Sequence, residues 1–423
     1  MTADTSLLIR QDNGAWLFGE NAVIRRIHDG VAQNKRPQEI AESEAEAEAI
    51  AASDLFSADG EPSCALKPVL AVVHLGYLCN LKCSYCYAPK SSQALSAGTM
   101  GRVARFLSEI ENDVTVQFMG GEPLVYLDQM AEFVAISRPL RKDRKTDFAI
   151  QTNGLLLGNK GIRDRLRDCG IGFGISFDGP GELGRDRFGP DCQALSGQYE
   201  SIFKVLRQEG FDFGLLSVVT ASNIHQLRDL LDWCVLHGIP RIKLNPIIKT
   251  NGDPQYYEEL RTAMLDLYAH WVGNSLYEKI EILNFNDFET NILSRLRPYM
   301  CRKVPCGAGR DQVAIDVSGE VFPCDYLIGQ EAFSLGRLRG GDLARMAISE
   351  VRTCLMDQQI QQRSECSDCA FTSICGNCAS DAQFCHGKVA GPRSTCAMDK
   401  KLIKKIIIEL NTNNKYCEHV LAR

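Results

Sequence analysis

Three cysteines stand close together in YLCNLKCSYCYAPK, residues 77–90. Cys79, Cys83 and Cys86 are separated by three residues and then by two. Three thiolates can hold a metal or cluster that needs four ligands, which leaves one coordination position open. Zinc sites more often take their ligands in close pairs, with the fourth ligand elsewhere. The spacing therefore favours a [4Fe–4S] cluster with one open iron, and half of a structural zinc site is the alternative.

A second group of cysteines lies near the carboxyl end. The chain has 423 residues and eighteen cysteines, of which eleven lie beyond position 300. Thiols stay reduced in the cytosol, so clustered cysteines there indicate metal sites rather than disulfides. Paired spacing such as CSDC and CGNC is also typical of zinc, which stays open as an alternative here. We therefore expect two separate metal regions.

The elements that position the first cysteines follow a regular pattern. Between residues 68 and 272, apolar runs typical of strands alternate with helical patterns that end in glycine. This alternation predicts an α/β unit with a parallel sheet, as an open doubly wound sheet or a partial barrel. In both, ligands meet at the carboxyl ends of the strands. The strand-like runs are 69–75, 114–118, 147–150, 171–177, 213–220 and 241–247.

The flanking regions differ from this unit. Before it, the sequence predicts a hairpin around Asp12–Gly14, a helix that stops at Gly30, and a polar Ala/Glu-rich helix or linker. Beyond about residue 295 the apolar periodicity ends, and metal clusters can supply the missing order. The expected domains are 1–62, 63–295 and 296–423.

Composition narrows the class of protein. The chain is 45% hydrophobic and 24% charged, with a net charge of −6, which gives no reason to expect nucleic acid as the main partner. No apolar run is long enough to span a membrane. The first residues lack the basic and apolar regions of a signal peptide. We expect a cytoplasmic protein without a membrane partner.

The cysteine loop resembles that of the radical S-adenosylmethionine (SAM) superfamily, because CxxxCxxC follows a first strand and Tyr85 precedes the last cysteine. The resemblance implies a partial (β/α)6 TIM-type barrel in which SAM occupies the open iron. A reductant such as flavodoxin or ferredoxin supplies the electron that cleaves SAM. The resulting 5′-deoxyadenosyl radical abstracts hydrogen, while the protein supplies position and excludes side reactions.

Motifs at four successive strand ends match this resemblance. In FMGGEP the glycines permit close approach of the backbone to a ligand, and Glu122 offers an acceptor for the ammonium of SAM. Asn153, Ser176 and Asp178 follow as cofactor contacts, although Asn153 and Asp178 could also serve turns. Arg187 resembles a carboxylate-binding arginine, with Arg185 as its rival. The implied cofactor-binding residues are Tyr85, Gly120, Gly121, Glu122, Asn153, Ser176, Asp178 and Arg187.

The C-terminal cysteines resemble the SPASM domain, a module for auxiliary clusters. Its opening half matches Cys306 and Cys324 with Gly319 between them, and its second half matches CSDCAFTSIC. Eight thiolates suffice for two further [4Fe–4S] clusters, which makes three in the chain. CGNC has one residue fewer than is usual, so Cys385 is the substitute for Cys378. By resemblance, Cys301, Cys306, Cys324 and Cys378 hold one cluster, and Cys366, Cys369, Cys375 and Cys396 hold the other.

Asp325 directly follows Cys324. A carboxylate beside a buried cluster is costly unless it is used or paired. In similar sulfatase-maturating enzymes, a Cys-Asp-aromatic segment carries the base that takes a proton after hydrogen abstraction. Asp325 is therefore our candidate general base, and a plain turn aspartate is the alternative.

Members of this group mostly oxidise or crosslink peptide side chains, which gives three hypotheses. The first is a maturase of a ribosomal precursor peptide. Residues 1–62 of this chain would bind the leader of that peptide by strand addition. The second is an anaerobic sulfatase maturase that forms formylglycine from Cys or Ser. The third is a non-catalytic iron–sulfur electron carrier, which has no need for SAM contacts at four strand ends. The N-terminal unit favours the first.

Overall fold

The computed structural model describes residues 5–9, 16–33, 35–52, 66–89, 91–188, 192–247, 253–293, 306–361, 366, 369–376, 378–389 and 391–423. The strands are β1 (Thr5–Ile9), β2 (Trp16–Glu20), β3 (Leu70–Gly76), β4 (Val114–Gly120), β5 (Thr146–Thr152), β6 (Ile171–Ser176), β7 (Leu215–Val219), β8 (Arg241–Pro246), β9 (Glu281–Ile282), β10 (Gln312–Ile315), β11 (Glu320–Phe322) and β12 (Gly336–Arg337). The helices are α1 (Asn21–Ala32), α2 (Pro37–Ile40), α3 (Glu44–Ala52), α4 (Ala97–Glu109), α5 (Leu127–Leu140), α6 (Lys160–Cys169), α7 (Arg185–Phe188), α8 (Cys192–Gln208), α9 (Leu227–Leu236), α10 (Pro254–Gly273), α11 (Leu283–Leu293), α12 (Asp342–Ala347), α13 (Glu350–Gln361), α14 (Thr372–Cys375), α15 (Ala379–His386), α16 (Cys396–Thr412) and α17 (Asn414–Leu421).

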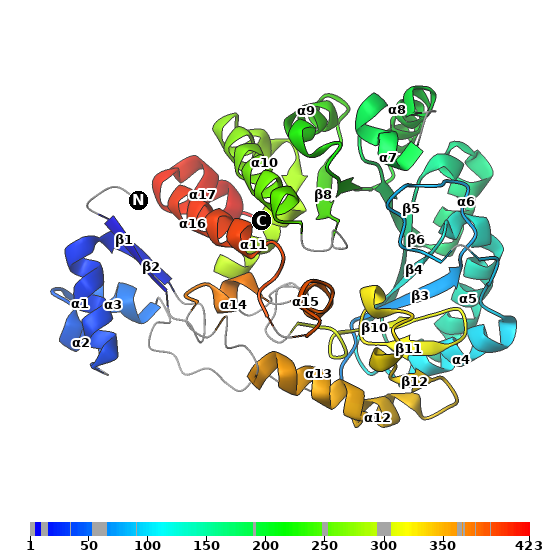
Figure 1. Cartoon of the computed structure of the whole chain (residues 1–423), viewed down its shortest axis with the longest axis horizontal. Helices are drawn as coiled ribbons and strands as arrows, with labels where there is room; N and C mark the ends of the chain where they lie inside the picture. Colours follow the sequence, from blue (N-terminus) through cyan, green and yellow to red (C-terminus); the bar gives the residue numbers. More distant parts are fainter. Residues whose placement is uncertain are drawn as a thin grey trace.

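The central sheet confirms the predicted α/β unit and decides between its two forms. All six predicted strands are present, as β3 to β8, and they pair parallel in the order of the sequence. A doubly wound sheet reverses its strand order at a switch point, and strands β3 to β9 of this sheet do not. Helices α4 to α9 lie along its outer face (Figure 1). The architecture is therefore a partial barrel.

Helix α4 illustrates how the sequence builds this layer. Ser96 caps its amino end, because the Ser96 hydroxyl accepts a hydrogen bond from the Thr99 backbone N–H at 3.2 Å. Met100, Val103 and Leu107 recur at helical spacing and are buried. Together with the apolar strand residues they form one continuous core.

The sheet also extends beyond the predicted strands. β10 pairs parallel with β3 on the edge away from β4, and β11 and β12 continue the sheet antiparallel. Gly319 makes the tight turn between β10 and β11 with a φ of +84°, and an added Cβ would lie 2.9 Å from the Thr99 side chain on α4. This glycine of the SPASM-like motif therefore permits both the turn and close packing on the barrel.

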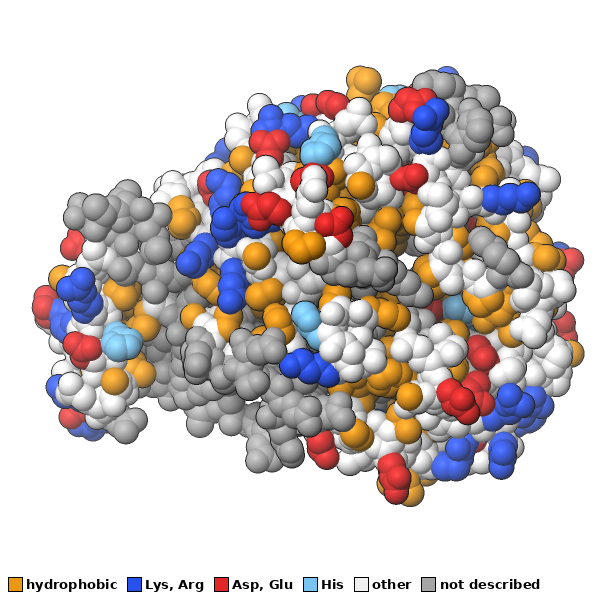
Figure 2. Space-filling model, viewed as in Figure 1, with side chains coloured by type: hydrophobic (Ala, Val, Ile, Leu, Met, Phe, Trp, Pro, Cys, Tyr) orange, Lys and Arg blue, Asp and Glu red, His pale blue; other side chains and the backbone are white. Residues whose placement is uncertain are grey.

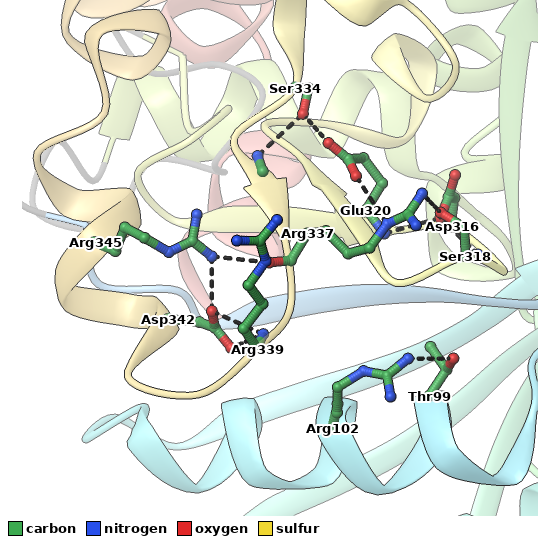
Figure 3. A network of polar contacts seen from close by, with 11 residues as sticks. Thr99, Arg102, Asp316, Ser318, Glu320, Ser334, Arg337, Arg339, Asp342 and Arg345 are labelled. Atoms are coloured by element: carbon green, nitrogen blue, oxygen red, sulfur yellow. Dashed lines mark hydrogen bonds and ion pairs between the residues drawn. The ribbon is translucent and has the colours of Figure 1, made fainter.

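Polar contacts fix this outer hairpin (Figure 3). Asp316 closes the turn by accepting hydrogen bonds from the Ser318 and Glu320 backbone N–H groups at 2.8 and 3.0 Å. Asp342 accepts from the Arg339 backbone N–H at 2.9 Å and pairs with Arg345 at 2.7 Å. The cysteine-rich region is thus attached to the edge of the barrel that carries the first cysteines.

The N-terminal unit lies at one end of the molecule (Figure 1). β1 and β2 form the predicted antiparallel pair, while the predicted turn residues 12–14 lie outside the described residues. The prediction that the helix stops at Gly30 is wrong, since α1 continues to Ala32. An added Cβ at Gly30 would lie 2.4 Å from Ile40, so this glycine serves close packing of α1 on α2.

None of the helices in the described part of the chain is long and apolar enough to cross a bilayer. On the face shown in Figure 2, Lys and Arg side chains are interspersed with Asp and Glu. That face therefore has no extended area of one charge among its described residues.

Candidate active site

The cysteine loop follows β3 directly and lies at the carboxyl edge of the barrel. Cys79 is exposed, Cys83 and Cys86 are half-buried, and none of the three is in a disulfide. The Cys79 sulfur accepts a hydrogen bond from the Leu81 backbone N–H at 3.4 Å. Burial raises the pKa of the Cys83 thiol. The positive charge of nearby Arg187 opposes this rise, and neighbouring Cys86 adds to it.

Gly120 and Gly121 bring the end of β4 against this loop. Gly120 has a φ of +127°, and an added Cβ would lie 2.1 Å from the Gly76 carbonyl oxygen. At Gly121 an added Cβ would lie 2.2 Å from the Leu78 carbonyl oxygen. The glycines therefore permit close approach of the backbone to the chain's own cysteine loop. Their contact with a ligand stays a prediction.

Glu122 is buried and already carries several hydrogen bonds. Its carboxylate accepts from the Thr152 hydroxyl at 2.6 Å and from the backbone N–H groups of Asn153 and Leu124 at 2.7 and 3.0 Å. Burial raises its pKa, and these hydrogen bonds oppose the rise. Because a carboxylate has about four acceptor positions, Glu122 first braces the strand ends and keeps little capacity for an ammonium.

Asn153 and Ser176 occupy the next two strand ends. The Asn153 amide nitrogen donates to the Asn80 side-chain oxygen at 2.7 Å and lies 4.0 Å from the Cys79 sulfur. Asn153 also makes the turn, since its side-chain oxygen accepts from the Leu155 backbone N–H. The half-buried Ser176 hydroxyl accepts from the Gln151 amide at 3.0 Å. Asn153 thus holds the first half of the cysteine loop.

Asp178, Arg187 and Tyr85 form a buried group beside Cys83. Asp178 accepts from Arg187 at 3.1 Å, from the Tyr85 hydroxyl, and from the Val218 backbone N–H at 2.8 Å. Burial alone would lower the pKa of Arg187, but Asp178 raises it overall, so the guanidinium keeps its charge. The rival Arg185 is exposed and pairs with Glu182 at 3.0 Å. Only Arg187 of the two lies at the site.

The residues present fit the cluster and cofactor that the resemblance implies. Three thiols on one loop are the donor set of a [4Fe–4S] cluster with one open iron. Among the described residues, the Arg187 Nε atom is buried and makes no hydrogen bond, so one N–H of the guanidinium that pairs with Asp178 still lacks an acceptor beside these thiols. A carboxylate such as that of SAM would satisfy it.

Asp325 lies against the cysteine loop rather than in an isolated turn. One carboxylate oxygen is 2.6 Å from His74 Nε2, and the other accepts from the Tyr87 hydroxyl at 3.0 Å. His74 comes from β3 and is buried, whereas the Asp325 side chain is 15% exposed. The Tyr326 ring lies beside that of Tyr87, with centroids 6.0 Å apart. Both oxygens are held while one side of the carboxylate stays accessible.

His74 and Tyr87 are functional candidates that the sequence analysis did not single out. His74 is a polar residue inside the apolar run VLAVVHL, and this was an available signal. Its partner Asp325 lies 251 positions away, however, and the pairing depends on β10 joining β3. Tyr87 follows the last cysteine of the loop, where an aromatic residue equally suits packing.

The C-terminal cysteines fall into two groups in space. Cys306 and Cys324 share a small apolar cluster with Ala379, which directly follows Cys378. Cys385 lies near the other end of α15, and its thiol donates to Asp381 at 3.5 Å. The pKa of Cys385 is raised to about 11, first by burial and then by Asp381. We infer that Cys378 suits the first set better than Cys385; Cys301 lies outside the described residues.

The second set gathers around Lys400 and Asp399 on α16. The thiols of Cys396 and Cys369 raise the pKa of Lys400. The Cys375 thiol donates to Asp399 at 3.8 Å. Among the described residues, no group of three or more His, Cys, Asp or Glu side chains is arranged to hold a single metal ion. The assignment of these cysteines to clusters stays a prediction.

Comparison with known proteins decides what this arrangement is. Residues 73–234 match the radical SAM superfamily, and residues 306–370 match SPASM, an iron–sulfur cluster-binding domain. The chain carries a radical SAM domain and a SPASM domain. Its cofactors are accordingly SAM with the [4Fe–4S] cluster of the radical SAM domain, and additional clusters in the SPASM domain. These matches favour iron–sulfur clusters over zinc for the two cysteine regions.

Two relatives show how far the sequence similarity extends. A cysteine-type anaerobic sulfatase-maturating enzyme of Clostridium novyi is 23% identical over 70% of this chain and 83% of its own length. An uncharacterized protein of Methanocaldococcus jannaschii is 28% identical over 40% of this chain. The matched region spans 58% of that protein's length.

Two solved structures share the fold. The structure described as native anSMEcpe with bound AdoMet has a TM-score of 0.71 at 19% identity, over 81% of this chain and all of that chain. Streptococcus suis SuiB bound to S-adenosylmethionine has a TM-score of 0.58 at 18% identity, over 92% of this chain and 96% of that chain. Both proteins are also known with a bound peptide, which is the precursor peptide SuiA for SuiB.

Proposed function

We propose that this radical SAM protein is a peptide maturase that oxidises or crosslinks a side chain of a ribosomally made precursor peptide. The observation that carries the proposal is the position of Asp325. This carboxylate adjoins Cys324 of the SPASM domain and is held against the SAM-cluster loop by His74 and Tyr87. A fixed carboxylate between the two cluster regions suits a reaction in which the substrate loses a proton as well as a hydrogen atom.

The residues take distinct roles in this reaction. When bound, SAM and the clusters supply the radical that removes a hydrogen atom and the acceptor for the remaining electron. Asp325 accepts the proton that the side chain loses, which completes a two-electron oxidation. Arg187 and Asp178 orient the cofactor side, since the guanidinium is buried beside Cys83. His74 and Tyr87 keep the Asp325 carboxylate in place.

The N-terminal unit supports a peptide substrate. The fold shared with SuiB covers 92% of this chain, which is about 389 residues. The part of the chain from position 66 to the end has only 358 residues, so it is too short to contain the whole match. The shared fold therefore includes part of the N-terminal unit. Among the described residues, β1 and β2 form a two-stranded sheet, so each strand has an edge not paired with another described strand. An extended leader peptide would add to such an edge.

The alternative is a sulfatase maturase that forms formylglycine from Cys or Ser. It is favoured by the similarity to anaerobic sulfatase-maturating enzymes over 70% of the chain or more. It needs the same base beside the same clusters. The two activities differ in substrate, because one acts on a small precursor peptide and the other on a Cys or Ser of a sulfatase chain.

Co-expression tests the proposal. The chain is co-expressed anaerobically with each short open reading frame that flanks its gene, and the peptides are analysed by tandem mass spectrometry. We expect one peptide to lose two hydrogen masses, or a multiple of two, at a defined residue. A Cys83→Ala variant is the matched control and leaves the peptide unchanged.

The same experiment separates the alternatives. A sulfatase co-expressed with the chain is treated with a hydrazide reagent that captures aldehydes. Capture at a Cys or Ser position, with no change in any flanking peptide, would replace the precursor-peptide proposal by the sulfatase alternative. Failure of both arms, although SAM is cleaved, would contradict both.

A further inference from the structure

Asp186 lies between the two rival arginines on α7 and has not been given a role so far. Its backbone carbonyl accepts from the Ser84 backbone N–H at 2.8 Å. One carboxylate oxygen also accepts from the Ser84 hydroxyl at 3.1 Å. Ser84 follows Cys83 and lies inside the cysteine loop. One aspartate therefore binds both the backbone and the side chain of a residue between two cluster ligands.

The other carboxylate oxygen of Asp186 is fixed to the barrel. It accepts from the Thr220 hydroxyl at 2.6 Å and from the Ser222 hydroxyl at 2.5 Å. Thr220 is buried just after β7, and its backbone N–H donates to Asn223 at 2.9 Å. The cysteine loop after β3 is thereby connected through Asp186 to the carboxyl end of β7, on the far side of the barrel opening.

A second acid on the same side completes the arrangement. Asp178 links the Tyr85 hydroxyl to the Val218 backbone N–H of β7. Ser84 and Tyr85, the two residues between Cys83 and Cys86, are thus each held by an aspartate that also binds the β7 side. Four hydrogen bonds converge on Asp186 alone, three of them to its carboxylate. These hydrogen bonds restrain the middle of the loop without a contribution from metal.

We propose that Asp186 is a positioning residue that fixes the middle of the cysteine loop against β7 before iron is loaded, so that Cys83 and Cys86 face the cluster site together. Preorganisation of this kind reduces the entropy that the loop loses when it binds the cluster and SAM. The inference rests on the SAM-cluster site of the radical SAM domain, and it holds whichever peptide or protein is the substrate.

Two measurements on the full chain test this role. Hydrogen–deuterium exchange of the iron-free protein reports the order of residues 79–88, and calorimetry with SAM reports the affinity of the reconstituted protein. In Asp186→Ala we expect faster exchange in this segment and about ten-fold weaker SAM binding, because several hydrogen bonds are lost together. The backbone bond to Ser84 survives, so binding is weakened rather than abolished.

Matched variants separate positioning from general damage. Ser84→Ala removes the hydrogen bond from the Ser84 hydroxyl to Asp186 and should give a smaller increase in exchange and a smaller loss of SAM affinity. This variant still tests the role if Asp186→Ala fails to fold. Glu182→Gln alters a carboxylate of the same segment that pairs with exposed Arg185, and should bind SAM as the wild type does. Iron in the SPASM domain should be equal in all variants.

Two results would overturn the inference. The first is wild-type exchange in residues 79–88 together with wild-type SAM affinity in Asp186→Ala and Ser84→Ala. The second is a loss of SPASM iron and of thermal stability that accounts for the weaker binding. If the wild-type protein itself failed to bind SAM, the cofactor assignment rather than the positioning role would be at fault.

Discussion

The two cysteine regions use their carboxylates in opposite ways. In the SAM-cluster loop, Asp178 and Asp186 bind the neighbours of the cysteines, Tyr85 and Ser84, while the Cys79 sulfur accepts a backbone N–H. A sulfur that accepts hydrogen bonds is suited to the thiolate form. Contacts from the protein therefore hold the loop on both sides of Cys83.

In the SPASM domain the carboxylates contact thiols directly. The Cys375 thiol donates to Asp399 at 3.8 Å, and the Cys385 thiol donates to Asp381 at 3.5 Å. If Cys375 binds iron as predicted, it loses the proton that it donates, and Asp399 then needs another partner. For Asp399 that partner is close, because Arg393 Nε lies 3.7 Å from its carboxylate. The comparison teaches that carboxylates hold the neighbours of the cysteines in the first region, whereas in the second they contact the thiols themselves.

Removal of iron should produce the largest difference between the two cysteine regions. Chelation is expected to raise hydrogen exchange about a hundred-fold or more in residues 366–396, where thiolate–iron bonds would be the main restraint. Residues 79–88 should change far less, because the bonds from Asp178, Asp186 and Asn153 remain. Exchange followed by mass spectrometry on loaded and chelated protein measures both segments at once. Equal loss of protection in the two would contradict the comparison.

Substitution of the base should separate the two halves of the reaction. Asp325→Ala is expected to lower product formation about a hundred-fold, the lower end of the usual range for general-base catalysis, because the proposed proton acceptor is removed. SAM cleavage should continue, since the cysteine loop is intact. The measurement is the ratio of modified peptide to 5′-deoxyadenosine. Turnover at the wild-type ratio would remove Asp325 from the mechanism.

His74 should show a smaller effect of the same kind. His74→Phe keeps a ring on β3 but removes the donor to Asp325, and we expect the product ratio to fall about ten-fold. His74→Gln restores an amide N–H near Nε2 and should recover most of the ratio. If His74→Phe and His74→Gln lowered the product ratio equally, and both lost iron or failed to fold, the role of His74 would be packing alone.

The choice between Cys378 and Cys385 should give the smallest change. Cys378→Ser is expected to lower iron from about twelve to about eight per chain, whereas Cys385→Ser keeps all three clusters. Iron and acid-labile sulfide analysis on reconstituted protein measures the difference. Loss of iron in Cys385→Ser alone would reverse the assignment that the position of Cys378 beside Cys306 and Cys324 supports.

The sequence predicted the barrel strands well because each contains several apolar residues, in a run or in alternation with polar ones, between turn residues. It did not predict β10 to β12, which have only two to four residues each and lie among cysteines and glycines. Short strands of this kind lack a periodic signal, and their pairing with β3 is a long-range contact. The position of Asp325 beside His74 depends on that pairing.

Site residues were predictable as types, but their partners were not. The sequence favoured Arg187 with Arg185 as a close rival, and burial beside Asp178 distinguishes them. Glu122 has the residue type for an ammonium site, yet three protein hydrogen bonds already occupy its carboxylate. Such competition for acceptor positions is a property of the folded chain.

The most direct test of the central claim is the fate of SAM. Protein reconstituted without oxygen is given SAM and dithionite, and 5′-deoxyadenosine is measured by chromatography and mass spectrometry beside a variant with Cys79, Cys83 and Cys86 all changed to alanine. We predict that the wild type forms 5′-deoxyadenosine, and that the variant forms none while it keeps the iron of the SPASM domain. No 5′-deoxyadenosine from the wild type, or equal amounts from both, would contradict the account.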